Sequence, residues 1–307
     1  MWSQVVDAIN GVYGAHAGHR AIHAKGTLCA GTFTAGRGAA RLTRAVHMQG
    51  DPTRAHIRFS NASGDPTKRD GTNDSRGMAV KFYLPDGTTT DISSVTIPVF
   101  VVRTPQDFLD LMMARAPDPA TGEMDMNKIG AFLGEHPESL PAIEAAMTAN
   151  APASFLQLRY FAVHAFKFVD TDGGSRWGRY RWEPEEGVAA LERDEAKQRD
   201  HDYLRAALEE RLARGPVGYR LWLQIAAPDD PLDDPTAAWP EDRENVELGR
   251  LQITEMAFDR EHDGDVLIFD PTRVPDGIEC SADPILNARP HAYKESVFRR
   301  TGVRRDP

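Results

Sequence analysis

Short segments rich in apolar and β-branched residues recur along the first hundred positions of the chain, and glycine or proline turns separate them. Segments of this length and spacing predict antiparallel strands in a meander or a barrel. The strands predicted in this part of the chain are residues 27–36, 41–48, 54–60, 77–84 and 92–102.

Helical patterns flank and follow these strands. The first twelve residues predict a short amphipathic helix, and residues 105–115 predict a helix opened by a proline. Residues 188–213 predict one long polar helix. Residues 125–148 predict helical stretches broken by Pro137 and Pro141, and residues 283–300 predict a helix interrupted at Pro290. Further strands are expected at 159–169, 177–182, 218–227 and 247–258, with an acidic, proline-rich surface loop at 228–244.

The alternation of strand-rich and helical regions, without an internal repeat or a Pro/Ser-rich linker, predicts one α+β domain over residues 1–307. The formal net charge of −10 makes nucleic acid an unfavourable partner. Two cysteines, Cys29 and Cys280, are too few for a disulfide framework. The N-terminus does not resemble a secretory signal, and no window approaches 18 apolar residues. We therefore expect no membrane span and a cytoplasmic location.

Familiar catalytic motifs are scarce in this chain. It contains no Walker loop, no GxGxxG after a strand, no HExxH and no GxSxG. His16, His19 and His23 are spaced by three and four residues, which would align them on one face of a helix. Spacing alone favours an ordinary polar helix face over a metal site, because no carboxylate or cysteine lies beside them.

Tyr293 follows Arg289 by four residues, so the two side chains share one helix face. A guanidinium in that position favours the ionised form of a phenol. Spacing alone again favours the simpler interpretation, an ordinary Arg/Tyr stack.

Taken together, fragments along the chain resemble the catalase family, and more closely its short, single-domain branch of catalase-related peroxidases. The resemblance extends from about residue 12 to residue 301. Its fragments are Arg20-Ala21-Ile22-His23-Ala24-Lys25-Gly26, Arg58-Phe59-Ser60, Arg76 to Tyr83, His164-Ala165-Phe166-Lys167-Phe168, Phe269-Asp270-Pro271, Pro275 to Glu279, Ser281 to Pro284, and R-x-x-x-Y at Arg289 and Tyr293.

The resemblance implies an antiparallel β-barrel surrounded by helices, with haem b buried between the barrel and a C-terminal helix. Tyr293 would bind the iron and Arg289 would keep it ionised. On the other face His23 would act on the peroxide, with Ser60 orienting it. The resemblance also implies that Arg20, Arg58 and Arg300 bind the haem propionates. Phe100 and Phe108 are candidates for the wall of the distal channel. Plain core packing is an equally open interpretation for these two phenylalanines.

One departure from the family pattern concerns the strand that approaches the peroxide. Typical catalases carry an asparagine there, and alignment on Pro98 places that position on Val95, with Thr96 beside it. The long arm and the C-terminal domain of full-size catalases are also absent, which leaves a monomer or a homodimer as the expected assembly. We therefore expect a peroxidase that reduces hydrogen peroxide or organic hydroperoxides with a small organic donor, and only weak catalase activity.

Two alternatives remain open on the same core. One is a haem enzyme that rearranges a hydroperoxide or acts on a biosynthetic intermediate, keeping both Tyr293 and His23. The other is a non-enzymatic haem carrier or sensor, which would have no need of His23 with Ser60 behind it.

Overall fold

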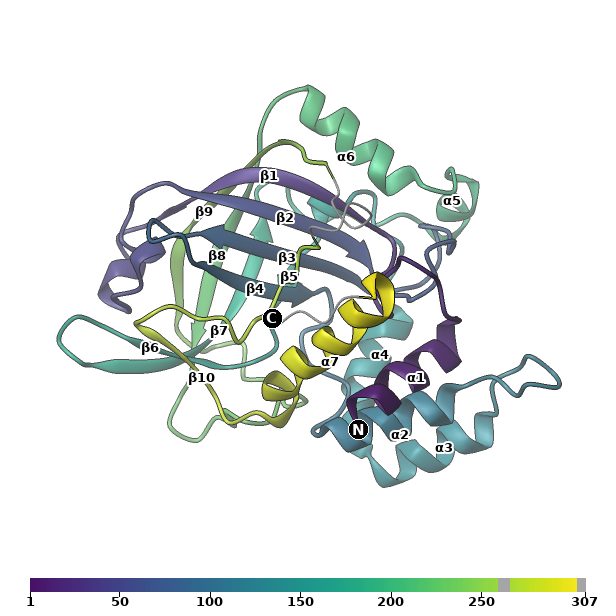
Figure 1. Ribbon diagram of the computed structural model, residues 1–307. Coiled ribbons are helices and arrows are strands. Elements are labelled where there is room, and N and C mark those ends of the chain that lie inside the picture. The colour runs from purple at the N-terminus through teal and green to yellow at the C-terminus, as the bar shows by residue number, and fades with distance from the viewer. Residues whose placement is uncertain (259–265, 303–307) are drawn as a thin grey trace.

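The computed structural model describes residues 1–258 and 266–302 of the chain (Figure 1). Its strands are β1 (Gly26–Ala35), β2 (Thr53–Asn61), β3 (Arg76–Tyr83), β4 (Thr89–Val95), β5 (Tyr160–Phe161), β6 (Phe166–Val169), β7 (Ser175–Pro184), β8 (Val217–Ile225), β9 (Asn245–Met256) and β10 (Ile278–Cys280). Its α-helices are α1 (Trp2–Tyr13), α2 (Pro105–Arg115), α3 (Met126–Glu135), α4 (Leu140–Thr148), α5 (Arg193–Gln198), α6 (Tyr203–Ala213) and α7 (Pro284–Thr301). Short 3₁₀ turns lie at η1 (Ala39–Arg41), η2 (Val46–Met48), η3 (Pro137–Ser139) and η4 (Phe155–Gln157).

The strands close into an antiparallel barrel, as the sequence pattern and the family resemblance predict. Neighbouring strands pair in the order β7-β5-β4-β3-β2-β1-β9-β8, and β8 pairs again with β7. Strands β6 and β10 extend the sheet beside β7 without joining the ring. Closure leaves the ring without free edges, so its backbone hydrogen bonds are satisfied internally.

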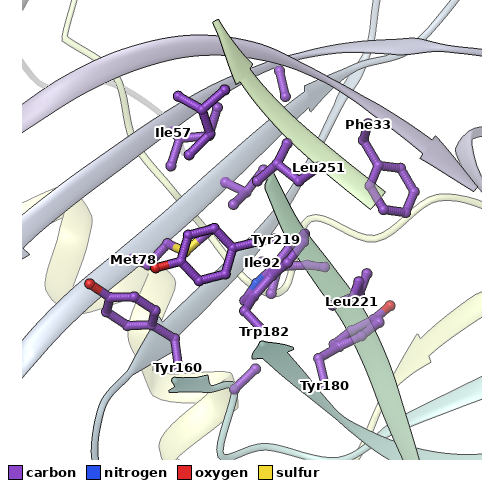
Figure 2. Close-up of a cluster of buried hydrophobic side chains, with 14 of the residues drawn as sticks. Phe33, Ile57, Met78, Ile92, Tyr160, Tyr180, Trp182, Tyr219, Leu221 and Leu251 are labelled. Carbon is purple, nitrogen blue, oxygen red and sulfur yellow. The ribbon is translucent and has the colours of Figure 1, made fainter. Parts of the chain in front are cut away.

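The interior of the barrel is filled by large side chains (Figure 2). On β2, residues 55, 57 and 59 are fully buried in this core, and on β3 residues 78, 80 and 82 join them. Trp182 of β7 is also fully buried among them. Because successive side chains of a strand point to opposite faces, Arg58, Ser60, Gly77 and Ala79 lie on the outer face of the same two strands. That outer face is one wall of the cavity described below.

A second hydrophobic cluster joins the helices beside the barrel. Figure 1 shows α1, α2, α3 and α4 gathered on one side of the barrel with α7 next to them, and α1 and α2 both contact α7. The buried members of the cluster are Val5, Ile9, Val102, Leu109, Leu111, Met112, Phe132 and Ile285. Within the residues that the structure describes, no helix is both long enough and apolar enough to cross a lipid bilayer.

The strand predicted at 41–48 is wrong, because this segment forms turns that include η1 and η2. Ala45 and Met48 are fully buried there, so the segment is apolar without being extended. Its polar groups are satisfied locally and across the fold. Thr43 Oγ1 donates to the Gly277 carbonyl at 2.6 Å, and Gln49 Nε2 donates to the carbonyls of Thr43 and Ala45. These bonds replace the ladder that a strand would need.

The long helix predicted at 188–213 is wrong in two places: residues 188–192 are not helical, and a break at residues 199–202 divides the rest into α5 and α6. The Asp70 N–H donates to the His201 carbonyl at 3.0 Å, and Arg69 Nη2 donates to the Arg199 carbonyl at 2.7 Å. The Asp70 carboxylate also accepts the Leu204 N–H at the start of α6. A segment distant in sequence therefore satisfies the groups freed by the break.

The helix break predicted at Pro137 is confirmed, because α3 ends at Glu135 and η3 begins at Pro137. The other two prolines have a weaker effect than the sequence predicts. Helix α7 runs without interruption through Pro290, and Pro141 lies in the first turn of α4 rather than at a break. A first-turn proline costs little, because its missing N–H has no intrahelical partner there. In α7 the buried side chains of Leu286 and Val297 hold the two halves of the helix against the rest of the fold.

Two predicted strands are shorter than expected. Residues 159–169 form β5 and β6, separated by residues 162–165, and β4 ends at Val95 instead of continuing to residue 102. Beyond β4, the Phe100 N–H donates to the Pro235 carbonyl at 2.7 Å. The acidic loop at 228–244 thus lies against this segment.

Candidate active site

A cavity of about 260 Å³ lies between the outer face of β2, β3 and β4 and the helices α1 and α7. Most of its wall is apolar, and a few polar side chains converge on it. Such a combination is typical of a site for a small molecule or a cofactor. Its wall includes these residues predicted from the sequence: Arg20, His23, Arg58, Ser60, Val95, Phe100, Phe108, Arg289, Tyr293 and Arg300.

His23 lies in the irregular segment between α1 and β1, so His16, His19 and His23 do not share a helix face. Its backbone has a φ of 57°, in the left-handed region, and it is the one non-glycine residue with positive φ in the described chain. The His23 N–H donates to the Ala62 carbonyl at 3.1 Å. Backbone in this region is costly for a residue with a side chain, and such strain is concentrated at functional sites.

The imidazole of His23 is held by β2. Its Nδ1 lies 3.0 Å from Ser60 Oγ, so the ring and the hydroxyl form a hydrogen bond. Gly77, opposite Ser60 on β3, leaves the space that the ring needs. A Cβ at position 77 would lie 2.8 Å from Ser60 Oγ and 2.9 Å from the His23 ring atoms Cε1 and Nδ1.

Burial and positive charge both keep His23 neutral. Burial, together with the nearby charges of Arg58, Arg289 and Arg20, lowers the pKa of His23 from 6.5 to about 3. An imidazole that is neutral at pH 7 has a free lone pair. His23 is therefore able to accept a proton from a molecule in the cavity.

Tyr293 projects from α7 into the same cavity and receives a hydrogen bond from Arg289, one helical turn earlier. The Arg289 Nε donates to Tyr293 Oη at 2.7 Å. The phenol oxygen is thus an acceptor beside a fixed positive charge. Such an oxygen is suited to bind a metal ion.

The structure adds two residues behind Arg289 that sequence reasoning did not assign to the site. His164 Nε2 lies 3.0 Å from Arg289 Nη1, and His164 Nδ1 lies 2.6 Å from Asp283 Oδ2. Because arginine only donates, Nε2 of His164 accepts and Nδ1 carries the proton toward Asp283. Burial lowers the pKa of His164 despite the Asp283 carboxylate, in agreement with this neutral form. An ordered chain therefore runs from Asp283 through His164 and Arg289 to Tyr293.

Part of this hydrogen-bonded series of side chains has a signal in the sequence. Asp283 precedes Pro284 and caps α7, since its carboxylate accepts the N–H groups of Ile285 and Leu286. An aspartate before a proline is a helix-start signal, but its second oxygen, which meets His164, has no local signature. The pairing joins residues 119 positions apart, and only the fold brings them together.

Three further arginines surround the cavity. Arg20 Nη2 donates to the Leu267 carbonyl at 2.8 Å, and its guanidinium lies over the Phe269 ring. Arg58 is buried on β2, and Arg300 lies in the last turn of α7. Guanidinium groups in such positions bind carboxylates through charge-assisted hydrogen bonds.

The remaining predicted residues divide into two groups. Val95 presents an apolar side chain to the cavity, and Phe100 and Phe108 stack at 6.0 Å between ring centroids. The Phe100 ring also lies 6.3 Å from that of His164, so it is on the side of the cavity that holds Arg289.

Thr96 is not part of the cavity wall. Its Oγ1 accepts the Arg76 N–H at 3.0 Å.

Comparisons with known proteins agree on one family. The catalase family model matches residues 4–306. A catalase-related peroxidase of Mycolicibacterium paratuberculosis (strain ATCC BAA-968 / K-10) is 45% identical over 303 residues, covering 98% of this chain and 95% of that protein. A catalase-related peroxidase of Synechococcus elongatus is 33% identical, with 97% and 88% covered.

The fold is also similar to that of a solved catalase structure. A crystal structure of a fungal catalase superimposes with a TM-score of 0.82 and 25% sequence identity. The match covers 92% of this chain and 59% of the fungal chain. The shared part is therefore nearly all of this chain and somewhat more than half of the larger protein.

Proposed function

The chain belongs to the catalase family, and we propose that it is a haem peroxidase in which Tyr293 binds the iron and His23 acts on the peroxide. It is an enzyme that acts on peroxide, like the catalase-related peroxidases that it resembles along its full length. The observation that carries the assignment of residues is that the hydrogen-bonded pairs His23–Ser60 and Arg289–Tyr293 both line one cavity.

The residues of the cavity fit haem. A porphyrin has apolar faces and two carboxylates, and the cavity offers apolar walls with Arg20, Arg58 and Arg300 on its lining. Tyr293 supplies a phenol oxygen that already accepts a hydrogen bond. Proteins of this family bind haem, and we propose the b type, whose propionates would meet these arginines. When bound, haem supplies the iron centre at which the O–O bond of peroxide is broken.

His23 would move one proton between the two oxygens of the peroxide. Its Nδ1 is hydrogen-bonded to Ser60 Oγ, which leaves Nε2 as the atom that takes a proton from one oxygen of the peroxide. The same Nε2 then gives this proton to the other oxygen, so that the second oxygen leaves as water. The neutral state of His23 at pH 7 permits the first transfer, and the Ser60 bond keeps the ring oriented for the second.

Arg289 would keep the Tyr293 oxygen in an acceptor role. Its guanidinium is itself oriented by His164 and Asp283, so the positive charge stays beside the phenol. A ligand whose supporting groups are hydrogen-bonded in this way is fixed in orientation before it binds a metal.

The electron donor is proposed to be a small organic molecule rather than a second peroxide. Val95 presents no amide to the cavity at the position where typical catalases, by the alignment on Pro98, carry an asparagine. A second hydrogen peroxide is therefore held less well. Peroxidase turnover should exceed oxygen release.

The test compares the two fates of hydrogen peroxide in the haem-loaded protein. We expect oxidation of an aromatic donor to be faster than oxygen release measured with an oxygen electrode. Val95→Asn should raise oxygen release, while Val95→Ala, which also changes the volume but adds no amide, should not. Oxygen release that dominates in the unaltered protein even with excess donor would contradict the proposal. A rearranged product from a fatty-acid hydroperoxide, formed without donor consumption, would favour the rearranging enzyme instead.

A further inference from the structure

One imidazole and two carboxylates, of Asp107, His136 and Glu138, lie together outside the lining of the cavity, where the start of α2 meets the end of α3 and η3. One ligand atom from each lies within 4.8 Å of the others. No other such group of His, Cys, Asp and Glu occurs in residues 1–258 and 266–302. Ligand atoms at about 2.0–2.2 Å from a zinc ion are about 3–4 Å apart, so small side-chain rotations would complete the geometry.

We propose that these three side chains form a binding site for a divalent transition-metal ion of the zinc class. One nitrogen and two carboxylate oxygens suit Zn²⁺ and its neighbours Co²⁺ and Ni²⁺. Calcium, by contrast, takes six to eight oxygen ligands, and magnesium keeps most of its water. Three protein ligands leave a fourth position for a water molecule.

The ligands are held in place by bonds that leave atoms available for a metal. The Thr104 N–H donates to Asp107 Oδ2 at 3.1 Å in a capping box, and Oδ1 remains for the ion. The His136 ring stacks on Phe132 with centroids 4.3 Å apart, and its backbone N–H donates to the Phe132 carbonyl. Supporting contacts of this kind orient metal ligands and are part of a built site.

The charges around the cluster also favour a cation. Asp107 and Glu138 bring two carboxylates together, and the Glu138 side chain is only 13% exposed. Arg103 contributes positive charge near Glu138, but its Nε pairs with Asp234 at 2.9 Å and its side chain is 54% exposed. His136, whose Nδ1 lies 3.3 Å from Glu138, adds charge only in its protonated form. A doubly charged ion would neutralise both carboxylates at once.

A bound ion would connect the first turn of α2 to the end of α3. Phe108, which follows Asp107, lines the candidate active-site cavity, so a metal bound by Asp107 would stabilise that part of the cavity wall. The site uses none of the residues assigned to peroxide chemistry. Its existence can be tested independently of the proposed function.

The experiment is equilibrium dialysis of the chelator-treated full-length protein, with its haem retained, against Zn²⁺ alone. We expect saturable binding of one ion that Asp107→Asn, His136→Ala and Glu138→Gln each weaken by at least about tenfold. Asp107→Asn keeps an oxygen for the Thr104 N–H, so the helix cap survives, and a melting temperature without metal checks each fold. Zn²⁺ should raise the melting temperature of the unaltered protein and of none of these three variants.

A matched control is His201→Ala. His201 also pairs with a carboxylate, since its Nδ1 lies 2.8 Å from Asp202, but it belongs to no group of three ligands. This variant should bind Zn²⁺ as the unaltered protein does. Equal binding by all four variants and the unaltered protein would overturn the proposal, and would leave the cluster as an ion pair beside a helix cap. If His136→Ala does not fold, the two carboxylate variants decide the outcome.

Discussion

Ser60 Oγ and His23 Nδ1 lie 3.0 Å apart, and this contact joins a strand of the barrel to an irregular segment with a strained backbone. The strand supplies a rigid position for the hydroxyl, and the hydroxyl fixes the ring. The imidazole of His23, the group proposed to act on the peroxide, is thus oriented by a strand of the barrel.

The first prediction concerns this pair. His23→Ala should lower kcat/KM for hydrogen peroxide by about 10²–10⁴, because the proton shuttle is removed. Ser60→Ala should lower it less, by about tenfold, because the ring loses only its orienting partner. The measurement is the rate of donor oxidation at equal haem content. Ser139→Ala, at a fully buried serine outside the cavity wall, should have no effect on the rate. Full activity of His23→Ala would contradict the mechanism.

The second prediction concerns the phenol of α7. Tyr293→Phe removes the oxygen that accepts the bond from Arg289, and haem affinity should fall by at least about tenfold. Haem retained after gel filtration, read from the Soret absorbance, measures the loss. Tyr13→Phe is the matched control, because Tyr13 also accepts a bond from an arginine, Arg115, but does not line the cavity. Equal retention by the two variants would remove Tyr293 from its proposed role.

The third prediction concerns the glycine beneath the His23 ring. Gly77→Ala would place a methyl group 2.8–2.9 Å from Ser60 Oγ and the His23 ring, so one of them must move. We expect a free energy of unfolding about 1–3 kcal/mol lower, together with a loss of peroxide activity at normal haem content. Gly130→Ala, on the exposed side of α3 with no atom within 4 Å, should instead add about 0.4–1 kcal/mol. Denaturant unfolding and steady-state kinetics separate the two effects, and an active, stable Gly77→Ala protein would show that the ring has more room than the structure gives it.

The fourth prediction concerns stability below neutral pH. His47 is buried against Phe82, and burial lowers its pKa from 6.5 to about 4. Between these values the unfolded chain binds a proton that the folded chain does not. The free energy of unfolding therefore falls as pH falls through this window, by about 1.4 kcal/mol per pH unit for this group. Burial also lowers the pKa values of His23 and His164, so these two histidines contribute to the same loss of stability at low pH.

His47→Leu isolates one of these contributions without touching the cavity. Urea unfolding at pH 7 and pH 5 should show a loss of stability that is about 2 kcal/mol smaller in the variant than in the unaltered protein. The residual loss would come from the other buried histidines. Identical losses in the two proteins would mean that His47 is protonated in the folded state at pH 5.

The strands were more predictable than the connections between them. Residues 54–60 and 77–84 alternate apolar and polar positions because one face fills the barrel, and this pattern is local. The segment at 41–48 has the same apolar content, yet it folds into turns whose partners include Gly277. A break such as that between α5 and α6 depends on Asp70, which no pattern within the helix reveals.

The candidate site shows the same division. The helical spacing of Arg289 and Tyr293 suffices to predict their contact, and the structure has it. Spacing wrongly aligned His16, His19 and His23 on a helix, whereas the family resemblance pointed to His23 alone. The contributions of Gly77 and of the His164–Asp283 pair arise from strand register and from a contact over 119 positions, so only the assembled fold could show them.

Closure of the barrel by the β7–β8 pairing has a consequence for motion. A ring without edges opens only when several ladders break together, so the amides of Ser60 and Gly77 should exchange hydrogen at the rate of global unfolding. Helices α1 and α2 belong to a separate hydrophobic cluster and depend on no strand for their backbone bonds. They should open at a lower free energy. We therefore expect the helical wall of the cavity to separate from the strand wall more readily than the barrel opens, so that a planar cofactor would enter through the helical side.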